Sequence, residues 1–172
     1  MSAPRPILIL MGVSGCGKST IAGLLVGRLG WRFEEGDDMH PPANVAKMHS
    51  AHPLTDEDRW PWLARIAAWI DERVASGEPA IVTCSALKRS YRDVLRRDPV
   101  VFVYLRGTRQ QIAERLRARH GHFMPAGLLD SQFADLEPPT PDEQSVTVDI
   151  GESPTQLADE IITGLGLAVE PR

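Results

Sequence analysis

One glycine-rich stretch organises this chain: Gly12-Val13-Ser14-Gly15-Cys16-Gly17-Lys18-Ser19. It fits the pattern G-x-x-x-x-G-K-[ST], in which backbone N–H groups surround phosphate oxygens. The apolar run Ile7–Met11 precedes it and is typical of a strand buried on both faces of a parallel sheet. A helical pattern over Ser19–Leu29 follows it, so the positive end of a helix would face the phosphates. Strand, turn and helix together predict a P-loop rather than a chance glycine-rich turn.

The same pattern predicts which residues contact a nucleoside triphosphate. Lys18 would reach the β- and γ-phosphates, and the Ser19 hydroxyl would ligate Mg²⁺. The residues expected at the nucleotide are Gly12, Val13, Ser14, Gly15, Cys16, Gly17, Lys18, Ser19 and Thr20.

The rest of the chain alternates strands and helices, which predicts one α/β domain over residues 1–172, with a parallel sheet between helices. Further strands are expected at Trp31–Glu35, Ala80–Cys84, Val100–Leu105 and Val146–Ile150. Helices are expected after Pro41-Pro42, over Arg59–Ala75 and Lys88–Arg97, after Thr108, over Leu128–Leu136 and after Ser153. In such a fold the functional loops lie at the carboxyl ends of the strands.

Composition narrows the class of protein. The chain has 172 residues, 42% of them hydrophobic, and a formal net charge of -4. Nucleic-acid-binding domains usually carry a basic surface, so we expect no nucleic-acid partner.

Cys16 and Cys84 lie in no CxxC pattern and are expected to be free thiols in a reducing cytosol. The run Ile7–Met11 is too short for a membrane span or signal peptide, so we expect a cytoplasmic protein that does not bind a membrane.

Other classes of P-loop protein lack support in this sequence. A GTPase would need a guanine-reading N-K-x-D segment after a strand, and the sequence contains none. Ser85-Ala86-Leu87 is similar to a short GTPase motif but lies too early in the chain. A nucleotide-dependent switch that binds a protein stays an alternative, although a switch would need no acceptor site.

Several short motifs outside the P-loop are more specific than the P-loop itself. They are Gly36-Asp37-Asp38-Met39-His40-Pro41, Asn44, Lys47-Met48, Pro53-Leu54-Thr55-Asp56-Glu57-Asp58-Arg59, Pro61-Trp62-Leu63, Cys84-Ser85-Ala86-Leu87-Lys88, Tyr91-Arg92, His122-Phe123-Met124, Leu128-Leu129, Ser131-Gln132-Phe133, Leu136-Glu137 and Pro139. With these motifs the chain resembles the gluconokinase family from about Ile7 to Ile150.

The resemblance implies ATP-dependent phosphorylation of D-gluconate at its terminal hydroxyl, giving 6-phosphogluconate. It also implies the three-layer P-loop kinase fold with strand order 2-3-1-4-5, a mobile lid over about residues 119–135, and a homodimer. Shikimate kinase and nucleoside-monophosphate kinase are the alternatives within the same class of enzyme.

Asp37 is the candidate that receives the proton of the acceptor hydroxyl. It follows the second expected strand, so it should lie near the P-loop at the catalytic edge of the sheet. Its alternative roles are to hold Mg²⁺ through water or to cap the turn after Gly36. His40 is expected either to bond the hydroxyls of the substrate or to stabilise its own loop.

A sugar acid carries a carboxylate, and the candidates to bind it are Arg59, Lys88 and Arg92. Arg59 stands in the first turn of a helix, where a cation is electrostatically disfavoured, so a functional partner would explain its place. Lys88 and Arg92 are four residues apart and therefore share a helix face. The alternative to a role in substrate binding is that this face is an ordinary solvated basic surface.

The expected lid supplies the remaining candidates. Arg119 is expected to stabilise the transferring phosphate, as the arginines of closing lids do. Arg115 is expected either to contact the nucleotide phosphates or to be structural. His122 and Gln132 are candidate substrate contacts.

Overall fold

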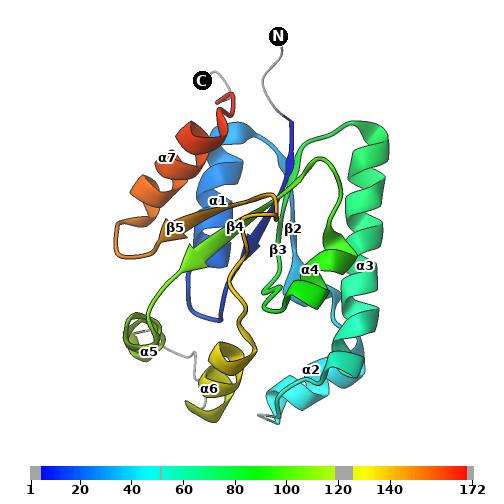
Figure 1. Cartoon of the computed structure of the whole chain (residues 1–172), viewed down its shortest axis with the longest axis vertical. Coiled ribbons are helices and arrows are strands. Elements are labelled where there is room, and N and C mark those ends of the chain that lie inside the picture. The colour runs from blue at the N-terminus through cyan, green and yellow to red at the C-terminus, as the bar shows by residue number, and fades with distance from the viewer. Residues whose placement is uncertain (1–4, 51, 119–125, 170–172) are drawn as a thin grey trace.

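The computed structural model describes residues 5–50, 52–118 and 126–169. All five strands of its single described sheet run parallel, in the order β2-β3-β1-β4-β5 (Figure 1). The strands are β1 (Ile7–Met11), β2 (Arg32–Glu35), β3 (Ala80–Thr83), β4 (Val100–Arg106) and β5 (Ser145–Asp149). The predicted fold class and strand order are therefore confirmed.

Helices cover both faces of this sheet. On one side α1 (Lys18–Leu29) packs beside α7 (Pro154–Leu165), and on the other α3 (Asp56–Ser76) packs beside α4 (Arg89–Leu95) (Figure 1). The other helical elements are η1 (Gly36–Met39, a 3₁₀ turn), α2 (Pro42–His49), α5 (Arg109–Ala118) and α6 (Ala126–Asp135). The result is the three-layer arrangement expected of alternating strands and helices.

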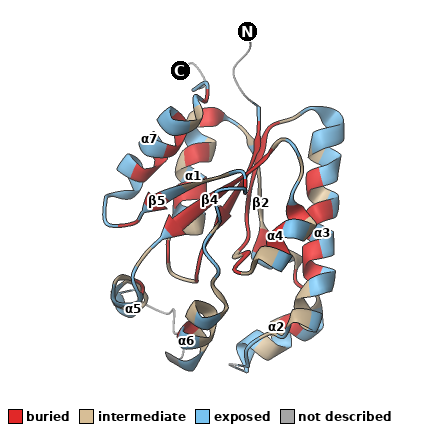
Figure 2. Ribbon diagram, in the orientation of Figure 1, coloured by how far each residue is buried: buried red, intermediate tan, exposed pale blue. Residues whose placement is uncertain are grey.

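β1 shows why the sheet is central to the core. All five of its residues are buried, and successive side chains point to opposite faces. Leu8 and Leu10 pack into the core under α1 and α7, whereas Ile7 and Ile9 pack into the core under α3. Figure 2 shows this burial concentrated in the sheet and on the inner faces of the helices. Each such side chain contributes roughly 1.5–3 kcal/mol of hydrophobic stabilisation.

Capping bonds confirm the helix starts predicted after Thr108 and Ser153, while α3 begins at Asp56, three residues before the predicted range. Thr55 caps α3 through the N–H of Asp58, and Ser153 caps α7 through the N–H of Gln156. The Thr108 hydroxyl accepts from Gln111 N at 3.1 Å ahead of α5. These bonds satisfy N–H groups that have no partner within the helix.

Three elements differ from the sequence prediction. The 3₁₀ turn η1 has no counterpart among the predicted elements, because four residues carry no readable helical period. Helix α4 is shorter than predicted at both ends, and Arg96 already has extended backbone angles (φ -66°, ψ 124°). Helix α6 begins at Ala126, two residues earlier than expected, and includes Gly127. Within the described residues, no helix is long and apolar enough to span a membrane.

Candidate active site

The P-loop joins β1 to α1, and its backbone has the conformation that glycine permits. Gly12 and Gly17 have φ angles of 141° and 103°, a region that other L-residues rarely enter. A Cβ atom on Gly12 would lie 2.8 Å from Cys16 Sγ and 2.9 Å from the carbonyl oxygen of Leu105. Cys16 is fully buried here, so it fills space beneath the loop, as expected of a small side chain at a free position of the motif.

Lys18 lies back over its own loop. Its ammonium donates to the carbonyl oxygens of Gly12 at 2.9 Å and Val13 at 3.1 Å. The side chain also lines a cavity beside the loop. A cation held here already faces the place where the phosphates of a nucleotide would lie.

Glu35 is a site residue that the sequence analysis missed. The Ser19 hydroxyl lies 3.1 and 2.9 Å from the two carboxylate oxygens of Glu35, and the Thr83 hydroxyl donates to Glu35 at 2.5 Å. Glu35 is the last residue of β2, so its place at a strand end was a signal available in the sequence. Hydroxyl and carboxylate oxygens are ligands that suit Mg²⁺, which fits the predicted metal role of Ser19.

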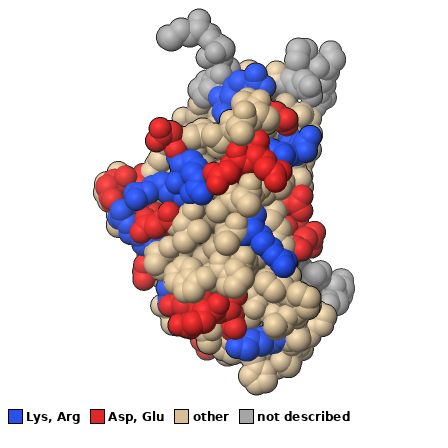
Figure 3. All heavy atoms as spheres, turned by 90° about the vertical axis from the view of Figure 1, so that its right-hand side faces the viewer, with Lys and Arg blue, Asp and Glu red and all other residues tan. Residues whose placement is uncertain are grey.

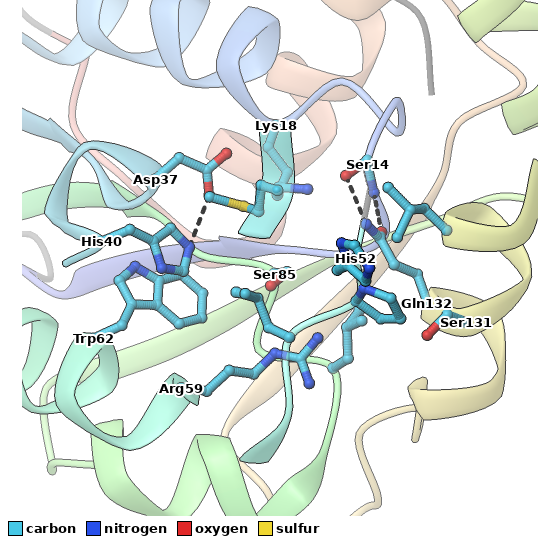
Figure 4. A pocket seen from close by; sticks show the side chains of 15 residues that line it. Ser14, Lys18, Asp37, His40, His52, Arg59, Trp62, Ser85, Ser131 and Gln132 are labelled. Atoms are coloured by element: carbon cyan, nitrogen blue, oxygen red, sulfur yellow. Dashed lines mark hydrogen bonds and ion pairs between the residues drawn. The ribbon is translucent and has the colours of Figure 1, made fainter. Parts of the chain in front are cut away.

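A cavity of about 170 Å³ opens beside the P-loop (Figure 4). Its walls come from the P-loop, η1, α2, the segment between α2 and α3, α3, the loop after β3 and α6. The lining residues are Ser14, Lys18, Asp37, His40, Met48, His52, Pro53, Leu54, Arg59, Trp62, Ser85, Leu87, Leu128, Ser131 and Gln132. Four predicted substrate contacts therefore share one cavity: Asp37, His40, Arg59 and Gln132.

Asp37 and His40 form one wall of this cavity. His40 Nε2 lies 4.0 Å from Asp37 Oδ1, and the imidazole stacks on Trp62 with ring centroids 4.1 Å apart. Trp62 is itself anchored, because its indole N–H donates to the carbonyl oxygen of Gly36 at 2.8 Å. The Asp37 side chain remains 69% exposed, so a substrate can reach it.

Arg59 projects into the cavity from the first turn of α3. Its guanidinium donates to the Tyr91 hydroxyl at 2.8 Å and to Asp135 Oδ2 at 3.4 Å. The Tyr91 hydroxyl in turn donates to Asp56. The unfavourable place of a cation at a helix start is thus offset by local partners from α4 and α6.

Lys88 lies just behind this arrangement. Its ammonium donates to Asp56 Oδ1 at 3.0 Å and lies 4.0 Å from Asp135 Oδ1. The bond to Asp56 raises the pKa of Lys88, which therefore stays protonated. Among the described residues that line the cavity, Lys88 does not appear.

The position of Arg92 argues against the predicted substrate role. Its side chain is only 1% exposed, and it donates to both carboxylate oxygens of Glu143, at 2.6 and 3.2 Å. It also donates to the carbonyl oxygens of Ala86 and Leu87, just after β3. With its N–H groups engaged in the protein interior, Arg92 holds the loop after β3 in place and does not line the acceptor cavity.

Gln132 contacts the P-loop directly. Its Oε1 accepts from the backbone N–H of Ser14 at 2.7 Å, and its Nε2 donates to the Ser14 hydroxyl at 2.9 Å. In this structure the Ser14 N–H, which belongs to the P-loop, is therefore hydrogen-bonded to a side-chain amide.

A second cavity of about 250 Å³ lies on the other side of the P-loop. It is lined by Gly15, Gly17, Thr20, Ile21, Arg115, Ala118, Pro154 and Leu157. Arg115 spans its wall by donating to the carbonyl oxygens of Cys16 at 3.4 Å and Ile150 at 2.6 Å. Two further predicted residues, Arg119 and His122, lie outside the described residues.

Comparison with known proteins places this site in a family. A family model described as an AAA domain matches residues 7–139. The gluconokinase of Gluconobacter oxydans is 52% identical over 161 residues, which cover 92% of this chain and 90% of that protein. The crystal structure of a gluconokinase from Sinorhizobium meliloti superposes with a TM-score of 0.86 at 45% identity, covering 96% of this chain and 94% of that one.

More distant structures share the fold alone. A shikimate kinase from Bacteroides thetaiotaomicron superposes with a TM-score of 0.66 at 15% identity, covering 94% of this chain and 99% of that one. The P-loop, the cavity beside it and the similarity over nearly the whole length lead to one conclusion. This chain belongs to the gluconokinase family of P-loop kinases.

Proposed function

We propose that this protein transfers the γ-phosphoryl group of ATP to the terminal hydroxyl of D-gluconate, giving 6-phosphogluconate and ADP. One observation carries the proposal beyond family membership: the cavity has two chemically different ends (Figure 4). Asp37 lies beside Lys18 at one end, and Arg59 lies at the other. A sugar acid also has two such ends, a hydroxyl for Asp37 and a carboxylate for Arg59.

Phosphoryl transfer depends mainly on positioning and charge neutralisation, and each described residue has a place in it. Asp37 orients the terminal hydroxyl and accepts its proton. Arg59 binds the carboxylate, replacing its contact with Asp135. The P-loop amides and Lys18 hold the phosphates, and the cavity lined by Arg115 takes the base of the nucleotide.

Mg²⁺ belongs beside Ser19 in this proposal. Ser19 and Glu35 supply the oxygen atoms, with the hydroxyl as the direct ligand and the carboxylate oriented next to it. When bound, the ion neutralises negative charge on the phosphates. Asp37 is kept for the acceptor, because it lines the acceptor cavity.

Several finer features of the proposal come from the sequence analysis. We propose that Arg119 stabilises the transferring phosphate, that His122 contacts the substrate, and that residues 119–135 act as a lid. We also propose that the protein is a homodimer and acts in the cytoplasm. Light scattering on the purified protein would measure the oligomeric state directly.

The first test is an assay of ADP release with ATP, Mg²⁺ and a panel of acceptors. Gluconate should be turned over in preference to shikimate, other sugar acids and nucleoside monophosphates. Turnover of another acceptor without gluconate would reject the substrate and keep the kinase. ATP hydrolysis independent of every acceptor would favour the nucleotide-dependent switch.

Asp37→Asn tests the proposed proton acceptor. We expect kcat to fall by roughly 10²–10⁴, the usual contribution of a general base, while nucleotide affinity is kept. Asp38→Asn is the matched control, because Asp38 is exposed and adjacent in the same 3₁₀ turn. Equal kcat values for the two variants would remove Asp37 from the mechanism.

A further inference from the structure

A buried asparagine stands behind the His40 and Asp37 wall of the acceptor cavity. Asn44, in α2, is only 3% exposed. Its Nδ2 donates to the carbonyl oxygen of Asp58 at 2.8 Å and lies 3.2 Å from Nδ1 of His40. Asn44 thus ties α2 to the start of α3 and contacts the imidazole on the side away from Asp37.

The hydrogen-bonding capacities of these groups determine the protonation of the ring. A backbone carbonyl can only accept, so the Asn44 atom that faces Asp58 must be the NH₂ nitrogen. The same nitrogen faces His40 Nδ1, which must therefore accept as well. A neutral imidazole has one donor and one acceptor nitrogen, so the proton of His40 lies on Nε2.

The surroundings of His40 keep it neutral. Burial is the main cause that lowers its pKa from the ordinary value of 6.5; Arg59 lowers it further, and Asp37 acts in the opposite direction. The Trp62 ring stacks on one face of the imidazole, and Asn44 contacts its Nδ1 edge. A 180° turn of the ring would keep the stack on Trp62 but would replace Nδ1 by a carbon atom and so lose the bond to Asn44.

We propose that Asn44 is a positioning residue, which holds His40 as the Nε2–H tautomer so that the imidazole presents a hydrogen-bond donor to Asp37. His40 is the fixed member of the pair, because its side chain is 3% exposed, whereas that of Asp37 is 69% exposed. We expect the exposed Asp37 carboxylate to rotate and close the 4.0 Å separation between His40 Nε2 and Asp37 Oδ1. The second oxygen of Asp37 then stays free to accept the proton of the substrate hydroxyl.

The role of Asp37 in this inference rests on the proposed function. The tautomer of His40, however, can be tested without substrate. Nitrogen-15 NMR of the ligand-free protein at neutral pH distinguishes the two tautomers of each histidine, and loss of signals in His40→Gln assigns those of His40. We expect Nε2 as the protonated nitrogen and Nδ1 as the unprotonated one. A proton on Nδ1 in the unaltered protein would overturn the proposal, whatever any variant does.

Asn44→Leu tests the link to catalysis. Without the Asn44 donor the tautomer preference should weaken in the same spectra. We expect kcat for gluconate to fall by about tenfold or more, while the KM for ATP stays unchanged. A merely structural Asn44 would change stability and leave the tautomer and kcat of the folded protein as they were, which would reject the positioning role.

His40→Gln and His40→Asn form a matched pair that does not depend on the fold of an Asn44 variant. Both remove the aromatic stack on Trp62, but only glutamine carries an NH₂ near the place of Nε2. We expect His40→Asn to have a kcat roughly ten- to a hundredfold below that of His40→Gln, the effect of losing a hydrogen bond to a charged group. Equal kcat values would overturn the proposal. If the unaltered protein fails to phosphorylate gluconate, the proposed function fails while the tautomer result stands.

Discussion

At the scale of single residues, arginines with similar sequence surroundings have different roles in the structure. Arg59 lines the acceptor cavity, whereas Arg92 is buried against Glu143. The sequence could predict that both are cations near the site, because both follow strand ends or helix starts. It could not predict the fate of Arg92, because its partner Glu143 lies 51 residues further along the chain.

Arg92→Met should destabilise the protein rather than weaken substrate binding. Removing one member of a buried ion pair leaves the other charge uncompensated, which typically costs about 3–5 kcal/mol. Urea unfolding measures this loss, which should be larger than any change in the KM for gluconate, because Arg92 contacts the loop after β3 and does not line the cavity. Arg89→Met is the control, because Arg89 pairs with Asp142 on the surface and its loss should matter much less. A raised KM with unchanged stability would return Arg92 to the substrate site.

Glu35 shows a second limit of sequence reasoning at this scale. Asp37 was found because it follows a strand and belongs to a distinctive motif. Glu35 ends the strand itself and looks like an ordinary polar residue of an edge strand. Only the approach of Ser19 and Thr83 from neighbouring elements reveals it as part of the P-loop site.

At the scale of elements, residues at the start of α3 stabilise the helix and also lie next to the acceptor cavity. Asp58 closes the capping box with Thr55 and also accepts from Lys47 of α2 at 2.7 Å. The bond from Lys47, followed by that from Thr55, lowers the pKa of Asp58 from 3.8 to about 2. Because the folded pKa is the lower one, Asp58 contributes stability above about pH 4 and loses it as the pH falls towards 2.

Asp58→Asn should therefore remove part of the pH dependence of stability. Urea unfolding between pH 5 and pH 2 should show that the advantage of the unaltered protein over the variant shrinks as the pH falls. Glu57→Gln is the control, because Glu57 lies one residue earlier and is exposed. An advantage that stays constant down to pH 2 would contradict the role of the Asp58 charge.

Most of the elements could be predicted, and the reasons are local. Buried parallel strands are continuous apolar runs, and capping boxes mark helix starts within four residues. The short turn η1 was missed because its conformation depends on tertiary contacts. The N–H of Gly36 donates to Thr83 Oγ1, and its carbonyl accepts from Trp62. Those partners come from β3 and α3, far along the chain.

At the scale of the whole molecule, helix α6 connects the two halves of the site. Gln132 occupies the N–H of Ser14 in the P-loop, and Asp135, three residues on, pairs with Arg59 in the acceptor cavity. Residues three apart lie on one helix face. The triphosphate and the sugar acid must each replace a contact of the same helix, so the binding of one should favour the binding of the other.

Calorimetric titration can measure this coupling. A non-hydrolysable ATP analogue should raise the affinity for gluconate by about 5–150-fold, the usual range for coupled sites. The double variant Gln132→Ala, Asp135→Asn should bring this ratio close to one. Asp130→Asn is the control on the same helix, because Asp130 pairs with Arg109 on the surface. A ratio that persists in the double variant would show that α6 does not carry the coupling.

Surface charge fits a small-molecule enzyme at the same scale. On the face that carries α3, acidic and basic side chains are interspersed (Figure 3). This face therefore lacks the continuous basic surface that nucleic-acid-binding domains usually carry, and the net charge of the chain is -4.

The parallel sheet has a practical consequence for protein engineering. The carboxyl ends of all five strands lie at one edge of the sheet, here called the rim. The segments that line the cavity follow or lie beside these strand ends. Substitutions at Met48, Leu54 and Leu128 would reshape the acceptor chamber, while the buried strands that support it stay untouched. A designer seeking a kinase for another sugar acid can therefore vary the rim as a module and leave the scaffold constant.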